Sequence, residues 1–375
     1  MMSSPWSDLV DQVSADRLKN TIETLSSWNT RNTNTPEAWE VAEWIASQYR
    51  QLPHMEVEVW EYEIASGRRV PETKRVPQVI ATLPGRSTRR VMVGGHFDTL
   101  NADFEGDLFS LRAPGANDDA SGTALAMEVG RLMAANTWEN TLVFCAFSGE
   151  EQGLLGSRAL ATRAREESWV VDALLSNDMV GNSSTVRGAA DGQTLRIFSE
   201  ENPDRHQSRE LARWIEWITR GQIPGASVRP VFRKDRFARG GDHTPFNEAG
   251  FTAVRFVEQT EEYSRQHTTT DLPEFVDFAY LAQNTKINLL AMSMLASAGP
   301  QPSEVRVDLK QSYDTTLSWA GTPGSKYRVY WRETTSPTWQ GSEFVGETES
   351  FRSDLSKDDN VFAVAAEYGI PVVAT

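Results

Sequence analysis

The chain has 375 residues, a length that predicts about two domains, and its hydrophobic content of 39% is sufficient for a sizeable core. Its 37 basic and 52 acidic residues give a net charge of −15, which argues against nucleic acid or an anionic membrane as the main partner. Cys145 is the only cysteine, so no disulfide can form within the chain.

Apolar residues recur with helical spacing in two segments between residues 8 and 50. The polar stretch between them ends in Thr35 and Pro36, which predicts a helix start with Thr35 as the N-cap. Strand-like segments follow at residues 57–64 and 78–83. We therefore expect two helices that pack on a sheet.

Strands and helices then alternate as far as residue 297. We expect strands at residues 91–95, 141–147, 170–176, 193–198 and 252–257, and helices near 120–135, 151–165, 207–220 and 275–297. This alternation predicts an α/β fold with a mixed, mostly parallel central sheet flanked by helices on both faces. Ligands bind outside the carboxyl ends of the strands in such sheets, so polar residues at these ends are candidates for a site.

The sequence pattern changes at the linker SAGPQPSEV, near Ala298. Beyond it the strand-like runs are short and are separated by turns rich in Gly, Pro and Ser, at residues 305–309, 315–319, 327–331 and 361–365. Trp319 and the alternating Tyr327, Val329 and Trp331 would furnish their core. These features predict a large domain of residues 1–298 and a small C-terminal β-sandwich of residues 299–375, whose partner is unknown.

His96 and Asp98 follow the apolar run Val91-Met92-Val93 and so lie at the end of a predicted strand. Their side chains point to the same side of extended backbone, because side chains alternate with a period of two. A metal-bound imidazole usually donates its other N–H to a carboxylate. We therefore interpret His96 as a metal ligand and Asp98 as the residue that orients it, with a surface turn as the alternative.

Two pairs of adjacent carboxylates mark the next candidate positions. Asp118 and Asp119 begin a predicted helix, where one carboxylate would suffice as a cap and the other could face the crevice and bridge two cations. Glu150 and Glu151 follow an apolar strand, where they would repel one another unless cations neutralise them. Glu151 is the candidate ligand and Glu150 the candidate general base, with two solvated helix-start residues as the alternative.

Further candidates lie in the second half of the chain. Asp178 follows the predicted strand at 170–176, and His267 lies in the loop after the strand at 252–257. His243, in RGGDHTPF, could contact the site or could begin a helix with Asp242 as its cap. In KDRFARGGD, Arg236 or Arg239 could contact a substrate carbonyl or carboxylate, or could be a surface pair.

The ligand candidates balance two divalent cations in charge. Two zinc ions carry four positive charges, of which Asp118, Glu151 and Asp178 neutralise three and a bridging hydroxide the fourth. Nitrogen and oxygen ligands with an open water position are typical of catalytic zinc, and two-metal aminopeptidases hold their ions ~3.5–4 Å apart. Cobalt or manganese could occupy the same ligands.

The motifs HFD, GANDDASG, SGEEQGLLGS and NDM, with a late Tyr-Ser-x-x-His, together resemble the M28 family of co-catalytic zinc peptidases, the bacterial aminopeptidases in particular. The resemblance covers about residues 15–297. It implies that His96 and Asp178 bind one zinc ion, that Glu151 and His267 bind the other, and that Asp118 bridges them. It also implies that Glu150 is the general base and acid, that Asp98 orients His96, and that the Asp118–Asp119 peptide is strained and often cis. The C-terminal segment resembles the fibronectin type III-like domain of some secreted bacterial members.

The residues and the resemblance together predict a metal-dependent exopeptidase that removes N-terminal residues from peptides. The metals would polarise the scissile carbonyl and activate a bridging hydroxide, and Glu150 would transfer the proton. A carboxypeptidase or a glutaminyl cyclase on the same scaffold is one alternative, although a cyclase typically needs a single zinc ion. A peptide-binding protein without catalysis is the other, although every ligand and Glu150 are present.

The sequence also bears on the compartment. No stretch reaches the ~18 apolar residues of a membrane span. The first residues, MMSSPWSDLV, lack the charged and apolar regions of a secretory signal. We expect a secreted or periplasmic bacterial protein whose signal peptide is absent from this chain, with a cytoplasmic location as the alternative.

Overall fold

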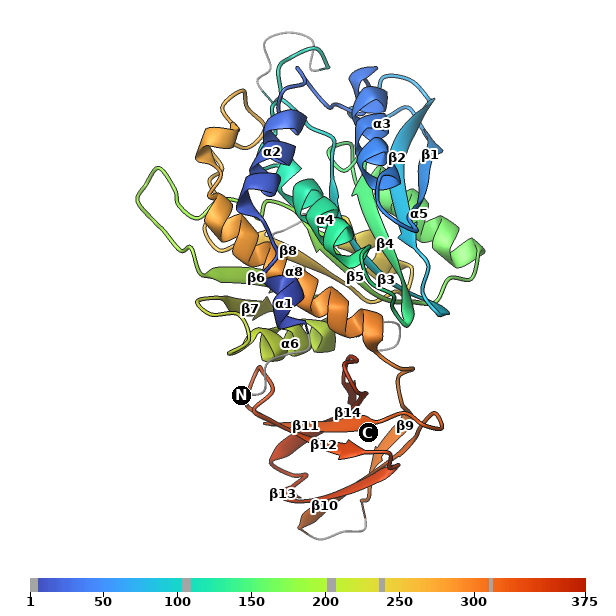
Figure 1. The fold of residues 1–375 in the computed structure, drawn as a ribbon. Coiled ribbons are helices and arrows are strands. Elements are labelled where there is room, and N and C mark those ends of the chain that lie inside the picture. Colours follow the sequence, from blue (N-terminus) through green and yellow to red (C-terminus); the bar gives the residue numbers. More distant parts are fainter. Residues whose placement is uncertain (1–5, 103–108, 201–206, 236–239, 310–312) are drawn as a thin grey trace.

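The computed structural model describes residues 6–102, 109–200, 207–235, 240–309 and 313–375 (Figure 1). Its helices are α1 (Ser7–Val10), α2 (Ala15–Leu25), α3 (Glu37–Arg50), α4 (Ala120–Met133), α5 (Leu155–Glu166), α6 (Ser208–Thr219), α7 (His243–Glu248), the short 3-10 helix η1 (Pro273–Phe275) and α8 (Phe278–Ser297). Its larger sheet contains β1 (Glu56–Ile64), β2 (Lys74–Leu83), β3 (Ser87–His96), β4 (Asn140–Phe147), β5 (Val171–Asn177), β6 (Thr194–Phe198), β7 (Ser227–Val231) and β8 (Ala253–Glu258). Among the described residues, no helix is long and apolar enough to cross a membrane.

The central sheet has the strand order β1-β2-β4-β3-β5-β8-β6-β7. Its middle strands β4, β3, β5 and β8 run parallel to one another. Antiparallel pairs lie on both sides of this parallel centre, because β2 pairs antiparallel with β1 and β4, and β6 pairs antiparallel with β8. The prediction of a mixed, mostly parallel sheet is confirmed.

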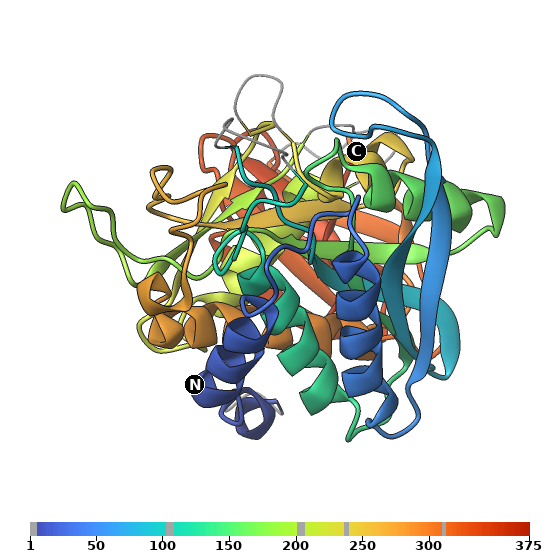
Figure 2. The ribbon, with the colours of Figure 1, turned by 90° about the horizontal axis from the view of Figure 1, so that it is seen from above.

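Helices cover both faces of the sheet, and Figure 2 shows the sheet between the two layers. The alternation of side chains in β3 explains this arrangement, because successive residues of a strand face opposite sides. Val91 and Val93 belong to the core that includes residues of α2, α3, α4 and α8, whereas Met92 belongs to a second core with Leu160 of α5 and Phe246 of α7. A strand segment buried on both faces is apolar, as the runs VMV in β3 and LVFCAF in β4 are.

The carboxyl ends of the parallel strands meet at one edge of the sheet. His96 at the end of β3 pairs in register with Phe147 at the end of β4, and Gly94 pairs with Ser176 of β5. The start of α4 lies directly over β3, since a Cβ atom on Gly95 would be only 2.6 Å from the backbone of Gly122. Glycine at position 95 therefore allows the residues before α4 to approach His96.

Three local predictions differ from the structure. The helix predicted from residue 151 begins only at Leu155, because residues 151–154 form a turn in which Gly153 and Leu154 have φ angles of 115° and 61°. Thr35 is not a helix cap: its hydroxyl donates to the carbonyl of Asn32 at 2.9 Å, and Pro36 occupies the cap position of α3. Asp242 occupies the cap position of α7, but its side chain accepts no capping hydrogen bond.

The C-terminal residues form two antiparallel sheets. Their strands are β9 (Ser303–Val307), β10 (Asp314–Ala320), β11 (Tyr327–Glu333), β12 (Gly341–Gly346), β13 (Ser350–Ser356), β14 (Asn360–Ala366) and β15 (Val372–Val373), in the orders β13-β10-β9 and β12-β11-β14-β15. Trp319, Tyr327 and Val329 are buried between them as predicted, and Trp331 is partly buried. The sequence did not predict β12, β13 or β15. The linker near Ala298 lies between α8 and β9, and the division of the chain there remains a prediction.

The C-terminal sheets pack closely against α6. The rings of Trp217 and Tyr330 lie 6.3 Å apart, and Arg213 donates from Nε to the carbonyl of Pro337 at 2.8 Å. Trp339 is fully buried in the core that also contains residues of α6 and α8. A continuous apolar core therefore joins the two parts of the chain.

Candidate active site

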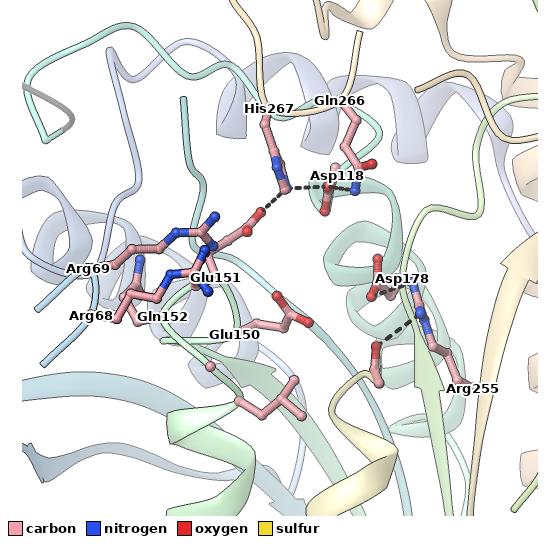
Figure 3. A pocket seen from close by; sticks show the side chains of 13 residues that line it. Arg68, Arg69, Asp118, Glu150, Glu151, Gln152, Asp178, Arg255, Gln266 and His267 are labelled. Atoms are coloured by element: carbon pink, nitrogen blue, oxygen red, sulfur yellow. Dashed lines mark hydrogen bonds and ion pairs between the residues drawn. The ribbon is translucent and has the colours of Figure 1, made fainter. Parts of the chain in front are cut away.

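A cavity of about 460 Å³ lies at the carboxyl ends of the central strands (Figure 3). Four of the five predicted metal ligands line it, together with Glu150, three arginines and two glutamines: Asp118, Glu151, Asp178, His267, Arg68, Arg69, Arg255, Gln152 and Gln266. The fifth predicted ligand, His96, is buried directly behind them. The structure thus brings together residues from the ends of β3, β4 and β5, the loop before α4 and the loop after β8.

Asp118 lies at the centre of this cluster. Its Oδ1 is 3.2 Å from Nε2 of His96, and its Oδ2 is 3.1 Å from Nε2 of His267. The carboxylate therefore presents one oxygen to each of two histidines from different parts of the chain. The Asp118–Asp119 peptide bond is cis, as the resemblance implied.

Two groups of potential ligands share Asp118. His96, Asp118 and Asp178 each offer one ligand atom, and these atoms lie within 4.8 Å of one another. Asp118, Glu151 and His267 form a second such group, in which Oε1 of Glu151 is 2.8 Å from Nε2 of His267. Glu150 completes a third group with His96 and Glu151. The two groups that share Asp118 contain the same residues as the two ligand sets that the resemblance implies.

Glu150 is half-buried, and its side chain extends into the cavity between the two groups (Figure 3). Asp98 holds its backbone, because the carboxylate of Asp98 accepts from the N–H groups of Glu150 and Glu151 at 3.2 and 3.3 Å. The same carboxylate is 3.6 Å from Nδ1 of His96, and the backbone carbonyl of Asp98 is 3.1 Å from that nitrogen. Asp98 thus contacts both His96 and the segment that carries the two glutamates.

The cluster perturbs the acidity of its own members. Burial, with a further contribution from Glu151, raises the pKa of Glu150 well above its ordinary value. Burial alone would lower the pKa of His267, but Glu151 and Asp118 raise it to about 11. The two histidines hold the pKa of Asp118 well below its ordinary value despite burial. Protons on the imidazoles therefore balance the carboxylates in the cation-free chain, and cations with these nitrogen and oxygen ligands could replace them.

A layer of buried residues behind the cavity fixes these side chains. Arg255 of β8 donates from Nη2 to Asp178 at 2.9 Å and from Nη1 to Asp235 at 2.8 Å. The carboxylate of Asp271 accepts from the backbone N–H groups of Asn117 and Asp118. The sequence analysis missed these residues. An arginine inside the apolar strand AVRFVE was the available signal for Arg255, whereas Asp271 lies in a polar loop without such a signal.

The sequence analysis left the roles of three residues undecided, and none of the three is among the described residues that line the cavity. His243 is the first residue of α7 and is fully buried, with its Nε2 3.4 Å from Oε1 of Glu200. It does not line the cavity. Arg236 and Arg239 lie outside the residues that the structure describes.

Comparison with known proteins identifies the family. The profile of peptidase family M28 matches residues 78–292, more than half of the chain. A protein of Pyricularia oryzae named "Probable zinc metalloprotease" is 36% identical over 402 residues, covering 94% of this chain and 80% of that protein. The chain belongs to peptidase family M28. A similarly named protein of Leptosphaeria maculans is 34% identical over 399 residues, covering 95% of this chain and 92% of that protein.

Solved structures share the fold of this M28 member. The LapA aminopeptidase of Legionella pneumophila superimposes with a TM-score of 0.61 at 20% identity, over 78% of this chain and 74% of that chain. The glutaminyl cyclase of Macrostomum lignano gives a TM-score of 0.62 at 20% identity, over 78% of this chain and 93% of that chain. Both similarities support the α/β architecture of the peptidase family, and at this identity they concern the fold alone.

Proposed function

We propose that this M28 peptidase is a zinc-dependent aminopeptidase that removes N-terminal residues from peptides with the help of two zinc ions. The position of Asp118 carries the proposal, because its two oxygens face two separate ligand groups. The names of the fungal relatives support zinc. The aminopeptidase among the structural neighbours is consistent with cleavage at the N-terminus.

The residues present fit two zinc ions. His96 and Asp178 would hold one ion and Glu151 and His267 the other, with Asp118 shared, which is a nitrogen and oxygen set typical of catalytic zinc. When bound, the ions would polarise the scissile carbonyl and acidify the attacking water. Arg255 keeps the carboxylate of Asp178 in place. Asp271 keeps the loop of Asp118 in place, because its carboxylate accepts a hydrogen bond from the backbone N–H of Asp118.

Glu150 supplies the proton transfer in this proposal. It extends into the cavity beside both ligand groups, and its backbone is fixed by Asp98. A carboxylate at this position can accept a proton from water and return it to a leaving amine. Glu150 would take a proton from the attacking water and pass it to the amine that leaves.

Paired peptides test both parts of the proposal. We expect the zinc-loaded protein to cleave a short peptide with a free N-terminus and to leave its N-acetylated twin intact, because the acetyl group removes the ammonium charge. A chelator should abolish cleavage, and added zinc should restore it at two ions per chain. Equal cleavage of both twins would contradict aminopeptidase action, and full activity with a single ion would contradict the two-ion site.

Zinc binding should release protons and should tighten as the pH rises. The raised pKa values of His96 and His267 mean that both imidazoles are protonated at neutral pH in the cation-free chain, and a ligand imidazole must be neutral. Calorimetric titration with zinc at pH 7, in two buffers of different ionisation enthalpy, measures this release directly. We expect at least one proton to be released per chain, and binding heats that do not depend on the buffer would contradict the pKa shifts.

A further inference from the structure

Two arginines reach the cavity from the hairpin loop between β1 and β2. Arg68 and Arg69 line the same cavity as the predicted metal ligands. Figure 3 shows both side chains extending from the loop toward Glu151. Arg69 donates from Nη1 to the backbone carbonyl of Glu151 at 2.7 Å, so its guanidinium lies beside a predicted ligand without pairing with its carboxylate.

The loop that carries these arginines is held in place by the fold. Gly67 and Val70 exchange two backbone hydrogen bonds of 2.9 and 3.1 Å, and the side chain of Val70 is buried. Asn34 donates from Nδ2 to the carbonyl of Arg69 at 2.9 Å. Arg69 has a φ of 61°, a left-handed conformation that non-glycine residues seldom adopt and that such contacts must maintain. The fold therefore places this guanidinium at the cavity.

The two arginines differ from the third arginine of the cavity in their charge partners. Arg255 forms ion pairs with Asp178 and Asp235. Within the described part of the chain, neither Arg68 nor Arg69 has a carboxylate within ion-pair distance. Cations at the ligand groups would neutralise Asp118, Glu151 and Asp178, which leaves two uncompensated positive charges on this wall of the cavity.

We propose that Arg68 and Arg69 form a subsite that binds a carboxylate of the peptide substrate. Guanidinium groups match the planar geometry of a carboxylate and bind it through two parallel hydrogen bonds. In a small cavity the carboxylate is either the C-terminus of a very short peptide or an acidic side chain next to the cleaved bond. The subsite rests on the proposed peptidase function for its peptide ligand and makes the enzyme selective for acidic or very short peptides.

Matched substrates distinguish the two sources of carboxylate. Ala-Ala and its C-terminal amide differ in the terminal carboxylate alone. Ala-Glu-amide and Ala-Gln-amide differ in a side-chain carboxylate after the cleaved bond, and Asp-Ala-amide and Asn-Ala-amide differ in one before it. We expect kcat/KM to favour the carboxylate member of at least one pair by on the order of tenfold to a hundredfold, the range of a charged hydrogen-bonded contact.

Substitutions connect that preference to the arginines. In the double variant Arg68→Gln and Arg69→Gln, the preferred ratio should fall to near one, because the carboxylate member of the pair loses more of its kcat/KM than the neutral amide does. Arg69→Lys, which retains the charge, should keep part of the preference. Arg229→Gln is the control, because this exposed arginine lies on β7 at the opposite edge of the sheet and should change nothing. A wild-type ratio near one for all three pairs, or a ratio that persists in the double variant, overturns the subsite.

A binding measurement separates failure of the subsite from failure of the proposed function. The same pairs are titrated calorimetrically into zinc-loaded full-length Glu150→Gln protein, with and without the two arginine substitutions. Tighter binding of a carboxylate member that disappears in the arginine variant supports the subsite even if no peptide is hydrolysed, in which case the peptidase proposal fails instead. Hydrolysis of neutral amides with equal binding of both members of every pair retains the peptidase and overturns the subsite.

Discussion

The variant Glu150→Gln should lose most peptide hydrolysis, with kcat falling by about 10²–10⁴-fold, the contribution of a positioned general acid–base residue. Glutamine has the size of glutamate but cannot accept a proton from water at neutral pH. The backbone of residue 150 should remain in place, because Asp98 holds it through the N–H group. Zinc content, measured by elemental analysis of dialysed protein, should therefore remain at the wild-type value.

The adjacent variant Glu151→Gln is the matched control. It makes the same chemical change one residue later, but it removes a carboxylate that lies 2.8 Å from His267. We expect this variant to lose zinc as well as activity. Wild-type hydrolysis in the Glu150→Gln protein would contradict the role of Glu150, and an equal loss of zinc in both variants would show that Glu150 is a ligand.

The variant Asp118→Asn should lose affinity at both zinc positions. Each of its carboxylate oxygens faces a different histidine, so the change weakens both ligand groups at once. Loss of a residue that merely supports a ligand typically costs about 10–100-fold in metal affinity or activity, and loss of the shared ligand should exceed that. Calorimetric titration with zinc measures the stoichiometry and affinity, and thermal unfolding of the cation-free protein shows whether the variant is folded.

The variant Asp178→Asn provides the comparison for Asp118. Asp178 belongs to the group that contains His96 and is absent from the group that contains Glu151 and His267. Its substitution should weaken one zinc position and leave the other near its wild-type affinity. If Asp118→Asn still binds one ion as tightly as the wild-type protein, the carboxylate is not shared and the two-ion arrangement is wrong.

The sequence predicts the fold because apolar runs mark the strands, and it predicts the position of the site because polar residues follow directly after these runs. His96, Glu151 and Asp178 each follow a strongly apolar run, and parallel strands bring such ends to one edge of a sheet. The structure places all five predicted ligands within one cluster, as the motifs implied. Their roles as zinc ligands, and those of Glu150 and Asp98, remain predictions that the variants above test.

The residues that the sequence analysis missed act through contacts between distant segments. Asp271 accepts a hydrogen bond from the backbone N–H of Asp118, which lies more than a hundred residues away in the sequence. No periodicity in the polar loop of Asp271 indicates that contact. Arg68 and Arg69 lie in an irregular hairpin loop whose direction depends on Val70 and Asn34. Thr35 has the chemistry of a helix cap, but its hydroxyl donates instead to the nearby carbonyl of Asn32. The conformational propensity of a single residue does not determine which partner its side chain contacts in the folded chain.

Mass spectrometry of one defined peptide pool tests the central claim most directly. The pool is incubated with zinc-loaded protein and, in parallel, with protein treated with a chelator. We predict stepwise loss of residues from the N-terminus that the chelator abolishes. Loss of residues from the C-terminus, loss of ammonia from peptides that begin with glutamine, or a pool that remains unchanged with zinc would each contradict a zinc-dependent aminopeptidase.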